Sequence, residues 1–259
     1  MDHLKDRFKI IRSTNFFFFV ILLTIIFFLF IDITLFKFSR DLSGILFWFF
    51  NEVVNNLAKI FNPLNLGIVL LILLIISHLL GNIIKEPKKR KIVIVKLNCN
   101  ESSLKESINY YKLIFNHMIT SIISTGIVCH LIKFIIGSSR PKYFFLYGYD
   151  RIDSFNLVHK MNALPSGHTQ ASFTLAILFY IYFNRYMILV FTLASLISIS
   201  RIFMSMHFPS DLISGAYLGT VFPIIIYNLF YKKRFSAFDQ RKILKFRIFM
   251  KFLWYKIYV

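Results

Sequence analysis

Long apolar runs separated by short polar segments dominate the pattern along this chain. A helix needs about 20 mostly apolar residues to cross the hydrocarbon core of a bilayer, which is about 30 Å thick. Runs of about this length predict six transmembrane helices, at about residues 15–36, 64–84, 113–137, 166–183, 186–206 and 211–231. The pattern therefore predicts an all-α fold, that of a polytopic membrane protein.

Three details of these runs refine the prediction. The first run is longer than the apolar part of a secretory signal, and no small-residue cleavage site follows it, which predicts an uncleaved span. A capping-box pattern from Ser103 to Glu106 precedes the third run and predicts one long helix that starts at the membrane surface. Only Asn184 and Arg185 separate the fourth run from the fifth, which predicts a helical hairpin.

The distribution of Lys and Arg predicts the orientation, because short loops rich in these residues stay on the cytoplasmic side. Most of the 31 Lys and Arg residues lie in the amino end (Lys5, Arg7, Lys9 and Arg12), in the loop 85–112, at Arg185 and in the basic tail 232–259. Both termini are therefore predicted to be cytoplasmic. The other ends of the spans would face the periplasm or exterior.

Composition supports the membrane class and excludes others. The chain has 259 residues, is 57% hydrophobic and only 17% charged, and has a mean hydropathy of +0.64, whereas a soluble chain has about 25% charged residues. Two cysteines, Cys99 and Cys129, leave neither a disulfide framework nor a cysteine-based zinc site. The net charge of +19 is divided among clusters between apolar runs, so we predict membrane lipids and no nucleic acid as partners. We expect residues 1–259 to be a single membrane-embedded domain, and the sequence does not specify its oligomeric state.

Three short motifs place polar residues at the predicted outer ends of the spans. They follow one another along the chain with gaps that leave room for one outer loop and then one span inward and one span back. The motif core covers residues 133–211 and contains Lys133, Arg140 with Pro141, then Pro165, Ser166, Gly167 and His168, and then Ser200, Arg201, His207 and Asp211.

These residue types suit the binding and hydrolysis of a phosphate monoester. Such a group carries close to two negative charges, which the cations of Lys133, Arg140 and Arg201 would neutralise. Ser166 is an expected helix N-cap, so the first amides of the following helix would point at a bound anion. Gly167 would let the phosphate approach closely.

Two histidines remain for two chemical tasks. Attack on phosphorus needs a nucleophile, and the leaving oxygen needs a proton, and His207 and His168 fit these roles. Asp211 lies four residues after His207, which puts its carboxylate within reach of one imidazole nitrogen and would fix the tautomer of the ring. No cluster of metal-ligand residues is apparent, so we predict a site without metal or cofactor.

The spacing K-x6-R-P, then P-S-G-H, then S-R-x5-H-x3-D resembles the signature of the type 2 phosphatidic acid phosphatase superfamily, with every signature position filled. The resemblance implies a helical core like that of the haloperoxidases, His207 as the nucleophile that forms a phosphohistidine, and His168 as the acid that later acts as a base. It also implies that the phosphate is bound by Lys133, Arg140, Ser166, Gly167 and Arg201. The substrates it suggests are undecaprenyl diphosphate, phosphatidylglycerol phosphate, phosphatidic acid and the phosphates of lipid A.

Two other functions remain open at this stage. A catalytically silent lipid-phosphate binder or flippase would use the same cations, but both histidines and Asp211 are more than binding requires. An oxidase-like site that holds vanadate is the other alternative, although the haloperoxidases of the wider superfamily are soluble.

Other residues have less specific interpretations. We expect His78, His117 and His130 to make polar contacts between helices. Asp32 is either a structural group or a wall of the site. The segment 38–63 is predicted to lie at the outer interface, and the aromatic residues of the loop 142–164 to anchor at the headgroup level or close over the substrate. The tail 232–259 is either an amphipathic helix on anionic lipid or a solvated segment.

Overall fold

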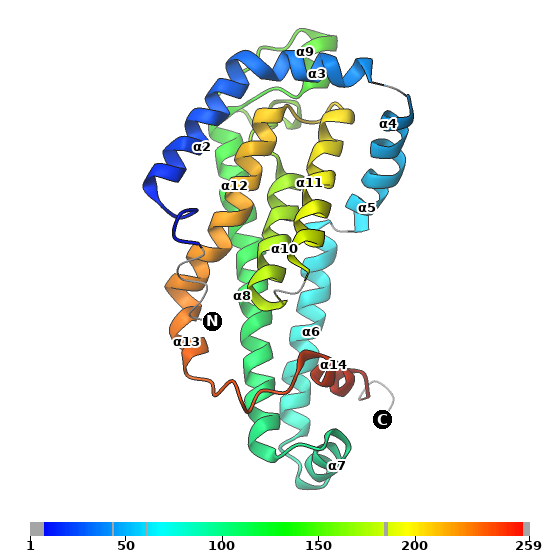
Figure 1. Cartoon of the computed structure of the whole chain (residues 1–259), viewed down its shortest axis with the longest axis vertical. Helices are drawn as coiled ribbons and strands as arrows, with labels where there is room; N and C mark the ends of the chain where they lie inside the picture. Colours follow the sequence, from blue (N-terminus) through cyan, green and yellow to red (C-terminus); the bar gives the residue numbers. More distant parts are fainter. Residues whose placement is uncertain (1–7, 43, 61, 184–185, 256–259) are drawn as a thin grey trace. The chain divides into compact units, whose positions relative to one another are not determined.

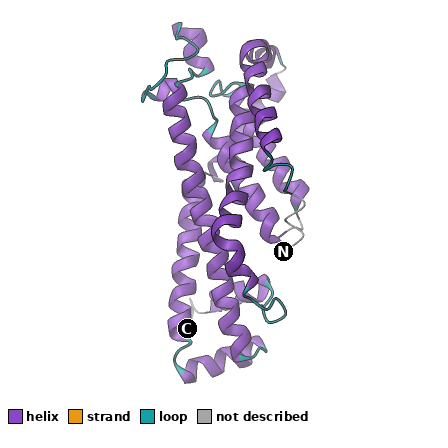
Figure 2. Cartoon of the chain, turned by 90° about the vertical axis from the view of Figure 1, so that its left-hand side faces the viewer, coloured by secondary structure: helices purple, strands orange, loops and turns teal. Residues whose placement is uncertain are grey.

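The computed structural model describes residues 8–42, 44–60, 62–183 and 186–255. These residues form helices joined by short loops, with no strand among them beyond an isolated antiparallel bridge between Ser138 and Ile152 (Figure 2). The elements are α2 (Thr14–Ile26), η1 (Phe27–Ile31), α3 (Asp32–Asp41), α4 (Gly44–Trp48), η2 (Phe49–Val54), α5 (Asn55–Ile60), α6 (Pro63–Ile83), α7 (Pro87–Leu97), α8 (Glu101–Ile136), α9 (Pro141–Tyr147), η3 (His159–Met161), α10 (Gly167–Phe183), α11 (Met187–Phe203), α12 (Pro209–Ile226), η4 (Tyr227–Tyr231), α13 (Lys232–Ser236) and α14 (Phe246–Tyr255). The predicted all-α class is confirmed.

A helix is present at each of the six predicted runs, but the count of six membrane spans is not confirmed. By length and composition, the described residues contain four helical segments able to cross a membrane: Thr14–Asp41, Gly44–Asn82, Glu101–Ile136 and Pro209–Ser236. A shorter apolar helix, Met187–Phe203, accompanies them, and α10 has 17 residues. The protein is therefore a polytopic membrane protein whose number of spans remains a prediction.

The start of α8 differs from the predicted capping box. The helix begins at Glu101, and the side-chain oxygen of Asn100 accepts a hydrogen bond from the backbone N–H of Ser103 at 2.7 Å. Asn100 is thus the capping residue, and Ser103 lies inside the first turn. The pattern Ser103 to Glu106 was wrong about the cap, although the single long helix that it predicted is present.

Some predictions fall on residues outside those described. Lys5 and Arg7 of the basic amino end, Asn184 and Arg185 of the expected hairpin turn, and the tail after residue 255 are among them. The two helices of that hairpin are described, and α10 and α11 lie side by side (Figure 1).

The chain divides into two compact units, and the first consists of residues 1–65 and 121–225. It contains α10, α11, most of α12, and the second half of α8. The segment 44–60, predicted to lie at the interface, is helical and packs against α11, where Phe50 stacks on Phe203 with ring centroids 4.4 Å apart. Phe144 and Phe145 of α9 (Pro141–Tyr147) contact the fully buried ring of Phe208, although Phe145 itself is exposed.

Two glycines of α12 allow a close approach that positions the motif residues of α10. A Cβ at Gly215 would lie 2.6 Å from the carbonyl oxygen of Ser166, and one at Gly219 would lie 2.3 Å from the carbonyl oxygen of Gln170. Small residues four apart let two helix backbones meet in this way. The start of α10 is therefore fixed against the first turns of α12.

The second unit consists of residues 66–120 and 226–259. In it, α14 packs its apolar side on α8: Phe249 is fully buried and stacks on Tyr111, with ring centroids 4.2 Å apart. Arg247 and Lys251 on the same helix are exposed. The solvated alternative for the tail is therefore wrong for α14, and contact with anionic lipid, which stays a prediction, would use the charges of this helix.

Two of the three histidines make contacts between helices in this unit. His78 Nδ1 of α6 lies 3.3 Å from Lys112 Nζ of α8, and the buried ring of His117 contacts Tyr227 and Tyr231. The first is a polar contact between helices, as expected, and the second is an aromatic ring contact.

Candidate active site

A cavity of about 300 Å³ lies in the first unit, between the C-terminal half of α8 and the start of α10. Its lining brings together residues from all three sequence motifs, which are separated by up to 74 positions along the chain. The motif residues that line it are Lys133, Arg140, Gly167, His168 and His207. His207 is 3% exposed, while His168 is exposed.

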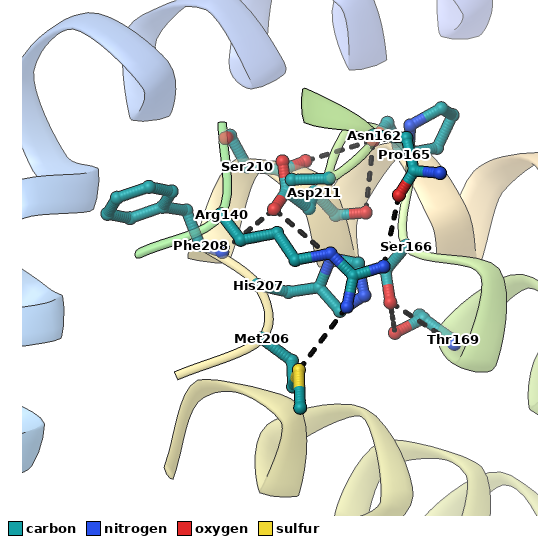
Figure 3. A network of polar contacts seen from close by, with 12 residues as sticks. Arg140, Asn162, Pro165, Ser166, Thr169, Met206, His207, Phe208, Ser210 and Asp211 are labelled. Atoms are coloured by element: carbon teal, nitrogen blue, oxygen red, sulfur yellow. Dashed lines mark hydrogen bonds and ion pairs between the residues drawn. The ribbon is translucent and has the colours of Figure 1, made fainter. Parts of the chain in front are cut away.

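His207 and Asp211 make the contact that their spacing predicted. Nδ1 of His207 lies 3.3 Å from Oδ2 of Asp211, and the same oxygen accepts the backbone N–H of Phe208 at 2.8 Å (Figure 3). Both side chains are buried, and Oδ1 of Asp211 has no hydrogen-bond partner among the described residues. Asp211 therefore occupies the Nδ1 side of the ring, and the backbone of Ala163 also interacts with His207.

Arg140 reaches the cavity and is held by side chains around it. Its Nη2 donates to Oδ1 of Asn162 and to Nε2 of His159, both at 3.0 Å, and its Nη1 lies 3.3 Å from the sulfur of Met206 (Figure 3). Nε of Arg140 is buried with no hydrogen-bond partner among the described residues. A guanidinium with an unused buried donor is well suited to an anionic oxygen.

Lys133 enters the same cavity from α8. Its Nζ donates to the carbonyl oxygen of Asn162 at 2.5 Å and to that of Ala163 at 3.3 Å, and the side chain is 5% exposed. After Lys133 the helix ends at Gly137, whose φ of +62° and close contact with the backbone of Asp153 leave no room for a side chain. This turn directs the chain from Lys133 toward Arg140.

Ser166 and Gly167 begin α10, but only Gly167 lines the cavity. The hydroxyl of Ser166 accepts the backbone N–H of Thr169 at 3.4 Å and its side-chain hydroxyl at 3.0 Å, as expected of a capping residue (Figure 3). The N–H of Ser166 donates to the carbonyl oxygen of Asp211 at 2.9 Å. The Ser166 side chain is fully buried and does not line the cavity. The structure therefore shows no direct route for the predicted binding of a phosphate in the cavity by this hydroxyl.

Arg201 also differs from the simple expectation of a phosphate ligand. Its guanidinium donates from Nη2 to Asn55 at 2.9 Å and from Nε to the hydroxyl of Ser200 at 3.2 Å, and it is not among the residues that line the cavity. Its carbonyl oxygen accepts the backbone N–H of His207 at 3.3 Å. The structure thus places Arg201 beside the site without placing its guanidinium in the cavity.

The surroundings of His207 favour a neutral imidazole. Burial lowers the pKa of His207 well below its ordinary value, and the positive charges of Lys133, Arg140 and Arg201 lower it further. A neutral ring has the lone pair that a nucleophile needs. The charge of Arg140 likewise lowers the pKa of His159, which is at the cavity in the outer loop.

Eleven of the residues that line the cavity were not identified as site residues from the sequence. Asn62, Asn162 and His159 lie in segments without a recognisable motif, and His130, expected between helices, faces the cavity instead. The one available signal was position, because His159 and Asn162 fall in the loop between the first and second motifs. Asp32 is fully buried and does not line the cavity, so it is not a wall of the site.

The deeper part of the cavity is largely apolar. It follows one face of α8 and one face of α10 away from the motif residues, past Ile122, Gly126, Ala171 and Leu175. A Cβ at Gly126 would meet no atom within 4 Å. The cavity thus has a charged part and a part lined mainly by apolar residues, with Gln170 and Thr174 among them. Within the described residues, no three His, Cys, Asp or Glu side chains are grouped as metal ligands would be.

Comparison with known proteins shows what the motif region is similar to. Residues 115–235 match the PAP2 superfamily. A lipid A 1-phosphatase from Rhizobium etli is 28% identical over 116 residues, which cover 45% of this chain and 50% of that protein. A lipid A 1-phosphatase from Rhizobium johnstonii is 27% identical over 116 residues, which cover 45% of this chain and 48% of that protein. The match spans about half the length of these curated relatives, and no solved structure matches this chain significantly.

Proposed function

Because residues 115–235 are a PAP2 superfamily domain, we propose that this chain is an integral-membrane phosphatase that hydrolyses the terminal phosphate of a lipid at the extracytoplasmic face. The observation that carries the proposal is the buried pair of His207 and Asp211 beside a cavity that also contains Lys133 and Arg140. The apolar continuation of this cavity suits a substrate with a lipid tail.

The proposed reaction has two steps, and in both of them His207 and His168 act on opposite sides of the phosphoryl group. Nε2 of His207 attacks phosphorus, the bond from phosphorus to the lipid oxygen breaks, and His168 gives its proton to that oxygen. His168 then takes a proton from water, the resulting hydroxide attacks phosphorus, and the bond to Nε2 breaks to release inorganic phosphate. Asp211 accepts a hydrogen bond from Nδ1–H of His207 and stabilises the positive charge that the ring carries once Nε2 is bonded to phosphorus.

Cations stabilise the charge that develops on the phosphoryl oxygens. Arg140 and Lys133 are in the cavity and act directly, and Arg201 acts from its place against Asn55. We propose that no metal ion or cofactor takes part.

Among lipid phosphates, the 1-phosphate of lipid A is the first candidate substrate, because both relatives described above are lipid A 1-phosphatases. Undecaprenyl diphosphate, phosphatidylglycerol phosphate and phosphatidic acid are the competing candidates. The chemistry at phosphorus is the same for all four.

Phosphate release by the purified protein in detergent tests the proposal. We expect release from at least one of these four lipids, undiminished by a chelator, and loss of release in His207→Ala. Ser198→Ala is the matched control, since this buried hydroxyl bonds only to Ala194 of its own helix. Release that needs magnesium would contradict the metal-free mechanism. Lipid binding without release from any of the four would favour the silent binder or flippase, and halide oxidation in the presence of vanadate would favour the oxidase alternative.

A further inference from the structure

Asp32, which belongs to none of the three motifs, has a buried carboxylate with three hydrogen bonds. Its Oδ1 accepts the backbone N–H of Ser210 at 2.9 Å, and its Oδ2 accepts the hydroxyl of Ser210 at 2.6 Å and Nη2 of Arg151 at 2.7 Å. Asp32 is 0% exposed and lies 178 positions before Ser210. A buried carboxylate is costly unless it is fully paired, so this arrangement needs a reason.

The reason lies at the start of α12. The helix begins at Pro209, which has no N–H, and the preceding residue, Phe208, has no side-chain acceptor for the N–H groups of the first turn. Asp211 supplies one half of a capping box by accepting the N–H of Phe208. Asp32 supplies the missing half from another helix, because it accepts the N–H of Ser210.

The same carboxylate also holds the residue next to His207. Arg151, paired with Asp32, places its guanidinium carbon 3.8 Å from the ring centroid of Phe208. Phe208 is fully buried, and the ring of Phe36 also packs against it, with the two ring centroids 5.8 Å apart. Both the backbone after His207 and the side chain of its neighbour are therefore fixed by contacts that begin at Asp32 (Figure 3 shows Phe208, Ser210 and Asp211 together).

We propose that Asp32 is a positioning residue for the His207 and Asp211 pair, acting through Ser210 and Arg151. The inference rests on the proposed function for its kinetic consequence, although the contact itself does not. Asp32 is outside the cavity, so it touches no substrate. It holds the short segment that connects the two members of the pair, and a small displacement of that segment would misalign Nε2 for attack.

Two variants test the inference with folded protein. Asp32→Asn keeps the size and one acceptor of the side chain but loses the charge that pairs with Arg151. Ser210→Ala removes only the hydroxyl donor and keeps the backbone N–H. We expect Asp32→Asn to lower kcat at least tenfold, and Ser210→Ala to lower it several-fold, with KM within threefold of wild type because the phosphate ligands are untouched. Ser198→Ala should match wild type.

A second measurement decides the matter whether or not any lipid is hydrolysed. Diethylpyrocarbonate modifies neutral imidazole, and the rate at His207 can be followed in its peptide by mass spectrometry. We expect Asp32→Asn to raise this rate at least threefold, since loosening the segment exposes a ring that is 3% exposed in wild type. His78, in the second unit, serves as an internal reference.

The outcomes separate the two claims. A variant with reduced thermal stability but wild-type kcat per folded molecule and an unchanged His207 modification rate would show a merely structural role and overturn the inference. If wild type releases phosphate from no lipid, the proposed function fails, and the modification rate alone then supports or overturns the positioning role of Asp32.

Discussion

Arg201 donates a hydrogen bond from Nη2 to Oδ1 of Asn55, 2.9 Å away, and the two residues are 146 positions apart in the chain. Asn55 is the first residue of α5, and it fixes the orientation of a guanidinium that is 4% exposed. The positive charge of Arg201 is therefore held at one fixed position beside the cavity. A lysine at position 201 would keep the charge but could not make both contacts with Asn55 and Ser200.

We therefore expect Arg201→Lys to lower kcat/KM by at least about tenfold, equivalent to about 1.4 kcal/mol of transition-state stabilisation. Steady-state kinetics on the best lipid phosphate would measure the effect. Arg40→Lys is the matched control, because Arg40 also donates from Nη2 to its neighbours, the carbonyl oxygens of Ile202 and Phe203, and does not line the cavity. Wild-type kinetics in Arg201→Lys would mean that its charge has a structural role only.

The pH dependence follows from His207. Its lowered pKa means that the ring loses its proton at a more acidic pH than an ordinary histidine, so the neutral nucleophile persists below pH 6.5. We expect the acid limb of kcat/KM, which reports the free enzyme, to lie below about pH 6.5. Lys133→Met should move this limb to higher pH, because it removes one of the charges that lower the pKa. The titration of the substrate affects wild type and Lys133→Met equally. Acid limbs at the same pH in the two proteins would therefore contradict the assignment to His207.

Gly126 offers a test of the lipid tail. Gly126→Leu places a side chain in the apolar part of the cavity without meeting an atom within 4 Å at Cβ. We expect KM for a long-chain lipid phosphate to rise several-fold, while hydrolysis of a short, soluble phosphate monoester stays within twofold. Gly67→Leu is the control, since its Cβ also enters open space and Gly67 does not line this cavity. Equal effects on long and short substrates would place the tail elsewhere.

The orientation of the site can be measured with single cysteines in a chain lacking Cys99 and Cys129. Leu157, in the outer loop near His159 and Asn162, is 84% exposed, and the Lys89 side chain is 51% exposed. We expect a membrane-impermeant maleimide to label Leu157→Cys in intact cells and Lys89→Cys only after permeabilisation. Leu157 is a better reporter than Phe145, whose ring stacks on Phe36. The reverse labelling pattern would put the site on the cytoplasmic side.

The sequence was informative where neighbours along the chain remain neighbours in space. Hydrophobic runs predicted the positions of the main helices, and the four-residue interval between His207 and Asp211 predicted a contact found at 3.3 Å. In that case the geometry of a tight turn converts the spacing directly into proximity. The meeting of Lys133 and Arg140 with His168 and His207 at one cavity was predicted differently, because the three motifs fall at the same predicted ends of the spans.

Contacts between distant segments could not be predicted in this way. Asn55, Asp32 and Asn162 reach Arg201, Ser210 and Arg140 only through the packing of separate helices and loops, and no periodicity records that packing. For the same reason, the sequence could not show that the N–H of Ser166 is already used by the carbonyl oxygen of Asp211. The hydrophobic pattern of the membrane helices does not predict which of their faces pack together, because apolar residues face lipid and protein alike.

The long-distance cap on α12 bears on what a minimal version of this protein would require. The recognisable superfamily region, residues 115–235, includes Ser210 and Arg201 but neither Asp32 nor Asn55. A fragment cut to that region would therefore leave the hydroxyl of Ser210 and the guanidinium of Arg201 without these partners inside an apolar environment. Supplying residues 8–65 as a separate polypeptide could restore them by complementation. For this chain, the boundary drawn by sequence similarity falls inside the set of residues that supports the candidate active site.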